Sequence, residues 1–165
     1  MIVAVIPVKR LANAKSRLAP RLSAEERAEL VVALLGQSFA ALRSVEEINR
    51  IALATPEADL AAELGAESLP DTGGLNASLA HAARWAKAAG ASALLILPGD
   101  LPLVEGADIV TLLRAAAPPP AVTIAPTRDG GTGALLLAPP DVIPPTFGPR
   151  SFSRHIEHAL RAHVT

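Results

Sequence analysis

Short apolar runs that alternate with longer helical patterns constrain the fold of this chain most strongly. Residues 1–6, "MIVAVI", are apolar throughout and rich in β-branched side chains, which is typical of a strand buried on both faces. Residues 23–42, "SAEERAELVVALLGQSFAAL", instead carry apolar side chains at helical spacing. Ser23 and Glu26 have the spacing of a capping box, so a helix is expected to begin there.

The same alternation continues along the chain. Further strands are predicted at 48–55, 66–70, 92–100, 121–127 and 133–138, and further helices at 56–65, 76–90, 106–117 and 151–163. Asn76 and Ser151 are the expected N-caps of two of these helices. The order predicts an α/β fold, a three-layer α/β/α sandwich with a mostly parallel sheet. The last two strands, joined by a tight turn at Gly130 and Gly131, predict an antiparallel edge, and residues 1–165 are expected to form a single domain.

Composition excludes several classes of protein. The net charge of −1 provides no general basic field for nucleic acid, so any anion site must be local. The absence of cysteine excludes disulfides, thiolate catalysis and cysteine-based zinc sites. No stretch approaches the roughly 20 apolar residues of a membrane span, and the N-terminal run lacks the order of a signal peptide. We therefore expect a cytoplasmic protein without a membrane partner, and a homodimer is left open.

A basic segment, "IPVKRLANAKSRLAP" at residues 6–20, follows the first strand. Ligands of open parallel sheets bind beyond the carboxyl ends of the strands. The segment contains neither a dinucleotide fingerprint nor a Walker A loop. We predict that Lys9, Lys15 and Arg17 neutralise a triphosphate, Arg17 as a fork for two oxygens. The alternative is a solvated loop with incidental cations, and Arg10 is expected on the surface.

Two further segments carry candidate nucleotide or metal ligands. Asp100 ends the apolar stretch "LILPGD" and precedes Leu-Pro, so a rigidly held carboxylate is expected at the sheet rim. Such an oxygen ligand suits Mg²⁺, although it could also be a turn or N-cap aspartate. In "DTGGLNASL", a glycine pair precedes a helix start, which favours close approach of a phosphate or a base edge. Asn76 and Ser78 are therefore candidate nucleotide-binding residues, with simple capping as the alternative.

A second anion site is suggested near the end of the chain. Thr132 follows a glycine pair, and Ser151 follows Gly148 at a helix start, with Arg150 and Arg154 nearby. Taken singly, each is a turn or cap residue. Together with the basic segment, they form a plausible second anion pocket.

Other catalytic patterns find little support. His155 and His158 share one helix face, but two histidines without a third ligand do not predict zinc. A serine hydrolase is not supported, because the chain has no G-x-S-x-G elbow.

Five motifs in order carry a resemblance to a known family. They are "IPVKRLANAKSRLAPRLSAEERAEL", "GLNASL", "LILPGDLPL", "GGTGALLL" and "FGPRSFSRHIEHA". The chain resembles the 2-phospho-L-lactate guanylyltransferase family, also described as phosphoenolpyruvate guanylyltransferase, which acts in biosynthesis of the deazaflavin coenzyme F-420. The resemblance implies a Rossmann-like nucleotidyltransferase fold of the nucleotide-diphospho-sugar transferase type. It also implies transfer of GMP from GTP to a phosphorylated three-carbon acid, with release of pyrophosphate.

The resemblance also implies roles for individual residues. Lys9, Lys15 and Arg17 would hold the GTP phosphates while charge builds on the leaving pyrophosphate. Asp100 would hold Mg²⁺, and Asn76 would lie near the nucleoside. The small phospho-acid would be bound by Thr132, Gly148 and Ser151.

The sequence departs from the family pattern in three places. Gly133 stands where the family usually has asparagine, and Thr127 stands where it often has aspartate. Family members also continue past the final helix into a strand with acidic residues that complete the metal site, whereas this sequence ends at Thr165. Asp71 or Asp129 could supply a second carboxylate.

Two alternatives to the guanylyltransferase reading stay open. The first is a non-catalytic or weakly active nucleotide-binding homologue, which the missing acidic segment favours. The second is a related nucleotidyltransferase that acts on a sugar phosphate or a pterin cofactor. The basic segment at 6–20 argues against the second, because it stands where those enzymes have a glycine-rich loop.

Overall fold

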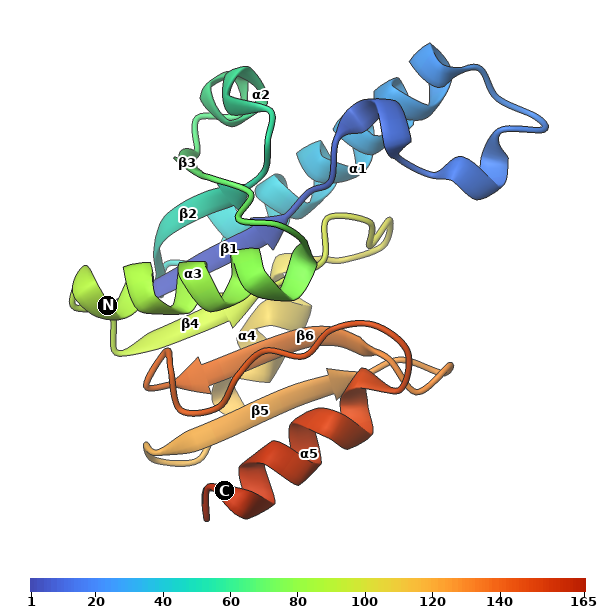
Figure 1. Cartoon of the computed structure of the whole chain (residues 1–165). Coiled ribbons are helices and arrows are strands. Elements are labelled where there is room, and N and C mark those ends of the chain that lie inside the picture. Colours follow the sequence, from blue (N-terminus) through green and yellow to red (C-terminus); the bar gives the residue numbers. More distant parts are fainter.

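A six-stranded sheet forms the centre of the protein in a computed structural model that describes residues 1–165, apart from the side chain of Asn13. The strands are β1 Ile2–Pro7, β2 Ile48–Ala54, β3 Glu67–Leu69, β4 Ala93–Ile96, β5 Ala121–Pro126 and β6 Thr132–Ala138. Their order across the sheet is β3-β2-β1-β4-β6-β5 (Figure 1). The strands β1, β2, β3 and β4 pair in parallel, whereas β6 pairs antiparallel with both β4 and β5.

The predicted sheet, mostly parallel with an antiparallel edge, is confirmed. The reversed strand β6 lies second from the edge, and the edge strand β5 runs in the same direction as β1 and β4. The carboxyl ends of β1, β4 and β5 therefore meet at one rim of the sheet, and β6 begins there. The sequence places its basic segment, Asp100 and the turn before Thr132 at these strand ends, so all three reach the same rim.

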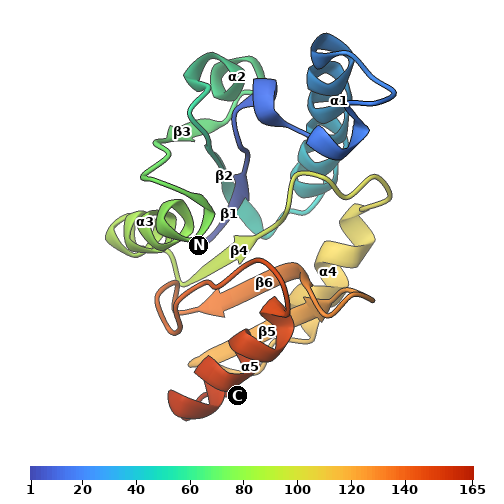
Figure 2. The same ribbon diagram turned by 45° about the vertical axis from the view of Figure 1, so that its right-hand side comes forward.

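Helices cover both faces of the sheet, as the predicted three-layer sandwich requires (Figure 2). Helices α1 Ala24–Arg43, α2 Ala58–Glu63 and α4 Gly106–Arg114 pack on one face. Helices α3 Leu75–Ala88 and α5 Ser151–Arg161 lie on the other, and the turns η1 Leu11–Asn13 and η2 Ser16–Leu18 follow β1. In the described part of the chain, no helix is both long and apolar enough to cross a membrane.

The two hydrophobic cores explain why β1 is apolar at every position. Ala4 and Ile6 point into the core beneath α1 and α4, while Val3 and Val5 point into the core beneath α3. Successive side chains of a strand alternate between its two faces, so a strand covered by helices on both sides has no position for a polar residue.

Helix starts agree with the sequence in one case and differ in two. The Ser23 hydroxyl accepts a bond from the Glu26 amide at 3.1 Å, and the Glu26 carboxylate accepts one from the Ser23 amide at 2.7 Å, which confirms the capping box of α1. The N-cap predictions for Asn76 and Ser151 are wrong, because α3 is capped by Gly74 and α5 by Arg150. Both side chains lie in the first helical turn and bond to other segments instead.

Candidate active site

A cavity of about 560 Å³ opens at the rim where β1, β2 and β4 end. Its volume lies within the range of small-molecule sites in proteins. Its charged lining side chains come from the basic segment, from the loop before α3 and from the turn after β4: Lys9, Arg10, Lys15, Asp71 and Asp100. The cavity therefore joins the first predicted anion site to the predicted metal ligand.

Lys15 and Asp100 meet at this cavity, although 85 residues separate them in the sequence. The Lys15 Nζ atom lies 2.9 Å from Asp100 Oδ2. The Lys15 backbone adopts a left-handed conformation, with φ of 47°, between the turns η1 and η2. Such a conformation is disfavoured for a residue with a side chain, and residues held in it tend to cluster at functional sites.

The basic segment is attached to α1 by Arg27. The Arg27 Nε atom donates to the Ala14 carbonyl at 3.2 Å, and Nη1 donates to the Leu22 carbonyl at 3.1 Å. These bonds bracket Lys15 and hold its loop against the helix. The loop is therefore anchored to the fold and is not a free surface segment.

Asp100 lies in a turn four residues after the end of β4, so the predicted strand to residue 100 is too long. A Cβ atom at Gly99 would lie 2.6 Å from Leu35 Cδ2 and 2.9 Å from Ile6 Cγ2, so only glycine lets this turn pack directly on the core. The Asp100 side chain remains 56% exposed. An ion pair this exposed contributes little to stability, so its importance is in positioning opposite charges at the cavity.

The donor set at Asp100 fits a Mg²⁺ ion that is completed by a substrate. No group of three acidic or histidine side chains suited to a metal occurs among the described residues. Mg²⁺ is commonly held by one or two carboxylates together with substrate phosphates and water, so a single carboxylate is sufficient. Of the two candidates for a second carboxylate, Asp71 lines the cavity and Asp129 does not.

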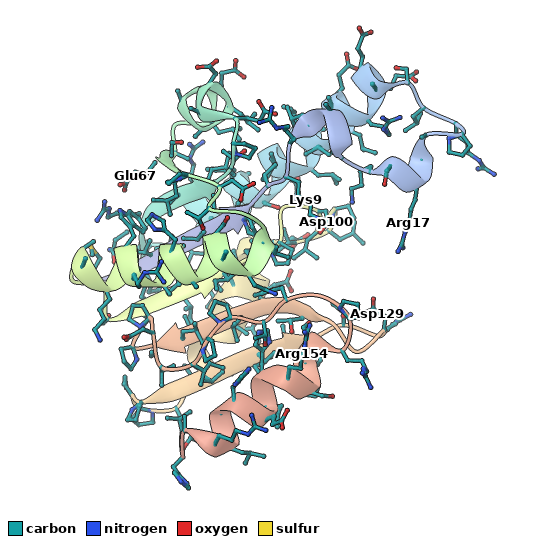
Figure 3. The ribbon with its side chains drawn as sticks, viewed as in Figure 1. Lys9, Arg17, Glu67, Asp100, Asp129 and Arg154 are labelled. Carbon is teal, nitrogen blue, oxygen red and sulfur yellow. The ribbon has the colours of Figure 1, made fainter. Side chains whose placement is uncertain are left out.

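The other arginines of the basic segment differ in their placement. Arg10 is exposed, as expected, but it also lines the cavity, which the sequence did not indicate. Arg17 is exposed and is not among the described lining residues. Figure 3 shows its side chain projecting from η2, apart from Lys9 and Asp100.

The loop before α3 is organised around the Asp71 carboxylate. Asp71 Oδ1 accepts bonds from the amides of Gly73 and Gly74, both at 3.1 Å, and from the Ser78 hydroxyl at 2.8 Å. These bonds lower the pKa of Asp71 below its usual value, and the bond from the Gly74 amide has the largest effect. The carboxylate is therefore ionised at neutral pH. The predicted nucleotide ligand Ser78 is buried, and its hydroxyl is already bonded to Asp71 and to the Thr72 amide.

Asn76 joins α3 to the segment that precedes α5. Its Nδ2 atom donates to the Phe147 carbonyl at 3.1 Å, and its Oδ1 atom accepts from the Phe147 amide at 2.8 Å. Phe147 itself lines the cavity. The side chain predicted to contact the nucleoside therefore holds one wall of the cavity in place.

Thr132 and Ser151, both predicted to bind the phospho-acid, are brought together in a buried network with His155. His155 Nε2 accepts from the Thr146 amide at 2.9 Å, so the ring hydrogen must be on Nδ1, which donates to Thr132 Oγ1 at 3.0 Å. Ser151 Oγ donates to the same oxygen at 3.0 Å. Burial lowers the pKa of His155 to about 4, in keeping with this neutral form.

Gly148 is the exposed member of the predicted phospho-acid site. Its φ of 121° is a conformation that favours glycine, and a Cβ atom there would lie 3.3 Å from Arg154 Nη2. Arg154 Nη2 donates to the Phe147 carbonyl at 3.3 Å, and Figure 3 places this arginine at the start of α5. The sequence did not indicate the part that His155 and Phe147 play here, although Ser151 and His155 stand at the spacing of one helix face.

Comparison with known proteins identifies the family. The chain matches the family model described as "Guanylyl transferase CofC like" over residues 2–165. The chain belongs to this guanylyl transferase family. A relative from Rubrobacter xylanophilus, named phosphoenolpyruvate guanylyltransferase, is 44% identical over 168 residues, which cover 99% of this chain and 82% of the relative. A relative of the same name from Sphaerobacter thermophilus is 43% identical, with 93% of this chain and 76% of the relative covered.

Solved structures of nucleotidyltransferases share the fold of this guanylyl transferase family member. A Desulfovibrio desulfuricans protein described as a nucleotide-diphospho-sugar transferase superposes with a TM-score of 0.79 at 17% identity, covering 98% of this chain and 76% of that protein. A nucleotidyl transferase from Methanothermobacter has a TM-score of 0.63 at 16% identity, covering 99% and 84%. The predicted nucleotidyltransferase fold is thereby confirmed, and so is the family.

A second cavity, of about 430 Å³, is lined in part by the segment 101–104. Leucine, alanine and proline dominate its described lining, and Asp108 is the one charged side chain among the described lining residues. An apolar cavity with a single negative charge does not suit a triphosphate. The cavity that contains Lys15 and Asp100 is therefore the candidate nucleotide site.

Proposed function

We propose that this chain transfers GMP from GTP to a phosphorylated three-carbon acid, phosphoenolpyruvate or 2-phospho-L-lactate, and releases pyrophosphate. Membership of the guanylyl transferase family supports the reaction class. The observation that carries the proposal is the 2.9 Å contact between Lys15 and Asp100. It supports the proposal because Lys15, proposed to bind phosphate, and Asp100, proposed to hold Mg²⁺, line one cavity, so that a polyphosphate chain could contact both.

The reaction requires positioning and neutralisation of charge more than covalent work by the protein. A phosphate oxygen of the acid attacks the α-phosphorus of GTP, the bond from that phosphorus to the bridging oxygen breaks, and the electron pair leaves with pyrophosphate. Lys9 and Lys15 would stabilise the charge that develops on the leaving group, with Arg17 as a predicted further contact. Asp100 would hold Mg²⁺, which when bound neutralises phosphate charge.

The phospho-acid is proposed to lie toward the start of α5. Gly148 is exposed there, and the amino end of a helix of this length attracts anions. Because the Ser151 hydroxyl is bonded to Thr132, and Thr132 in turn to His155, we propose that these two hydroxyls shape the site from within.

The choice of acid, the pathway and the location remain proposals. The name shared by the relatives supports phosphoenolpyruvate over 2-phospho-L-lactate, and either product would enter coenzyme F-420 biosynthesis. The cytoplasmic location stays a prediction, as does the homodimer. Of the alternatives, the relatives' names favour a catalytic protein over a nucleotide-binding one.

Incubation of the protein with labelled GTP, Mg²⁺ and each acid in turn tests the proposal. We expect pyrophosphate and a labelled GMP adduct with one of the acids, and neither product from an Asp100→Asn variant. Tight GTP binding without turnover on either acid would instead support a nucleotide-binding protein. Turnover with a sugar phosphate alone would support a different nucleotidyltransferase.

A further inference from the structure

The Asp71 carboxylate has one oxygen that the fold leaves available. Oδ1 accepts all three bonds that organise the loop before α3. Among the described side chains and amides, none donates to Oδ2, although Asp71 is exposed and lines the nucleotide cavity. Arg10 attracts this carboxylate electrostatically without forming an ion pair with it. A role in holding the loop accounts for the three bonds to Oδ1 but assigns no role to Oδ2.

The position of Asp71 separates it from the metal ligand. Asp71 follows β3 by two residues, whereas Asp100 follows β4. These strands are three places apart in the order β3-β2-β1-β4, which is about 14 Å at ordinary strand spacing. Ligands of one Mg²⁺ each lie about 2.1 Å from the ion. The arrangement favours different partners for the two carboxylates, with the phosphates held near Lys15 and Asp100 and the nucleoside extending toward Asp71.

The surroundings of Asp71 leave space for a planar base. Gly73 and Gly74 have φ of 102° and 119°, and a Cβ atom built on either would meet nothing within 4 Å. The nearby cavity wall is apolar where Pro56 and Leu75 contribute to it. An ionised acceptor beside open space and apolar walls matches a flat ligand that presents two adjacent donors.

We propose that Asp71 Oδ2 selects guanine by accepting hydrogen bonds from its N1–H and 2-amino groups. A carboxylate only accepts hydrogen bonds, and this edge of guanine only donates. Adenine presents an acceptor nitrogen at the equivalent place and would face the carboxylate with repulsion. The inference rests on the proposed function, since it names the residue that makes the nucleotide donor GTP.

Asp71→Asn tests the proposal, because it keeps the loop bonds and replaces the acceptor at Oδ2 with a hydrogen-bond donor. The donors of Gly73, Gly74 and Ser78 require the amide oxygen on the Oδ1 side, so the amide nitrogen takes the place of Oδ2. That nitrogen would oppose both guanine donors, whereas toward xanthine it would oppose only N1–H and would donate to the 2-oxo group. We expect affinity for GTP, measured by calorimetry without acceptor, to fall about 100-fold or more, and xanthosine triphosphate to become the preferred ligand.

One further measurement, on the unmodified protein, keeps the proposal testable if this variant folds poorly. Unmodified protein should bind inosine triphosphate, which lacks the 2-amino group, about tenfold more weakly than GTP, at the level of one lost hydrogen bond to a charged group. The matched control is Asp141→Asn, since Asp141 pairs with Lys87 at 2.6 Å and is not among the described residues that line the cavity. This variant should keep the preference for GTP.

Either of two results would overturn the assignment: equal affinity of the unmodified protein for inosine triphosphate and GTP, or an unchanged base preference in Asp71→Asn. If that variant with unchanged base preference also required more Mg²⁺, Asp71 would instead be a metal ligand. A protein that distinguishes the bases in binding but turns over neither acid would contradict the proposed reaction and support the role of Asp71.

Discussion

His155 should make the stability of this protein depend on pH in a way that can be calculated. The residue is fully buried, and its pKa is lowered from 6.5 to about 4, chiefly by burial and further by the charges of His158 and Arg154. The unfolded chain, in which the ring is hydrated, takes up a proton near pH 6.5. The folded state binds that proton less readily, so protonation favours unfolding. The contribution of His155 to stability is therefore complete above the unfolded pKa and is lost as the pH falls toward 4.

The size of the effect follows from the two pKa values. Between about pH 7.5 and about pH 5, linkage predicts that His155 alone reduces the free energy of unfolding by about 2 kcal/mol. The physical reason is visible in the network around the ring. A protonated Nε2 could no longer accept the hydrogen bond from the Thr146 amide, and the charge would have no water around it.

Urea unfolding of the unmodified protein and of a His155→Gln variant measures this contribution. Carboxylates that titrate in the same range affect both proteins, so the difference between the proteins isolates His155. We expect the unmodified protein to lose about 2 kcal/mol more than the variant over this interval. Equal losses in the two proteins would refute the reasoning and would mean that His155 is not protected from protonation in the folded state.

Three further variants test the site. Asp100→Asn should abolish turnover. It should leave the thermal unfolding midpoint nearly unchanged, because the ion pair with Lys15 is exposed. Full activity of the variant at ordinary Mg²⁺ would contradict the metal assignment. Lys15→Ala should weaken GTP binding about tenfold or more in calorimetry, as expected for a lost charged contact, and an unchanged affinity would return Lys15 to a solvated loop. Asn76→Ala should lower the free energy of unfolding by about 1–3 kcal/mol in urea, because it leaves the Phe147 amide without a partner. An unchanged value would show that water replaces the side chain.

The layers of the fold could be predicted from the sequence because they depend on patterns that are local. A short apolar run rich in β-branched residues, such as 1–6, is typical of a strand covered on both faces, and the capping box at Ser23 depends on residues three positions apart. Asp100 could be placed at the rim for the same reason, because it comes shortly after a buried strand, although that strand ends four residues earlier at Ile96. The approximate position of the site follows from strand order and the rule that ligands bind at the carboxyl ends.

The partners of the polar side chains could not be predicted in the same way. Asn76 and Ser151 are residue types that favour N-cap positions. Their side chains instead bond to Phe147 and Thr132, which lie in segments distant in the sequence. A local preference of about 1 kcal/mol can be exceeded by the two hydrogen bonds of Asn76 or by the single buried bond of Ser151. The sequence likewise does not indicate that Arg10 and Asp71 line the same cavity, because several segments distant in the sequence build its wall.

The sequence by itself determined the alternation of strands and helices, the rim at which charged side chains gather and the family to which the chain belongs. Only the tertiary structure decided that Lys15 contacts Asp100, that Asn76 holds Phe147, and that Thr132 bonds to both Ser151 and His155. The physical reason is the distance along the chain over which each kind of interaction acts. Periodicity and capping act between neighbours along the chain, whereas hydrogen bonds and ion pairs at a rim depend on how strands far apart in sequence come to lie side by side.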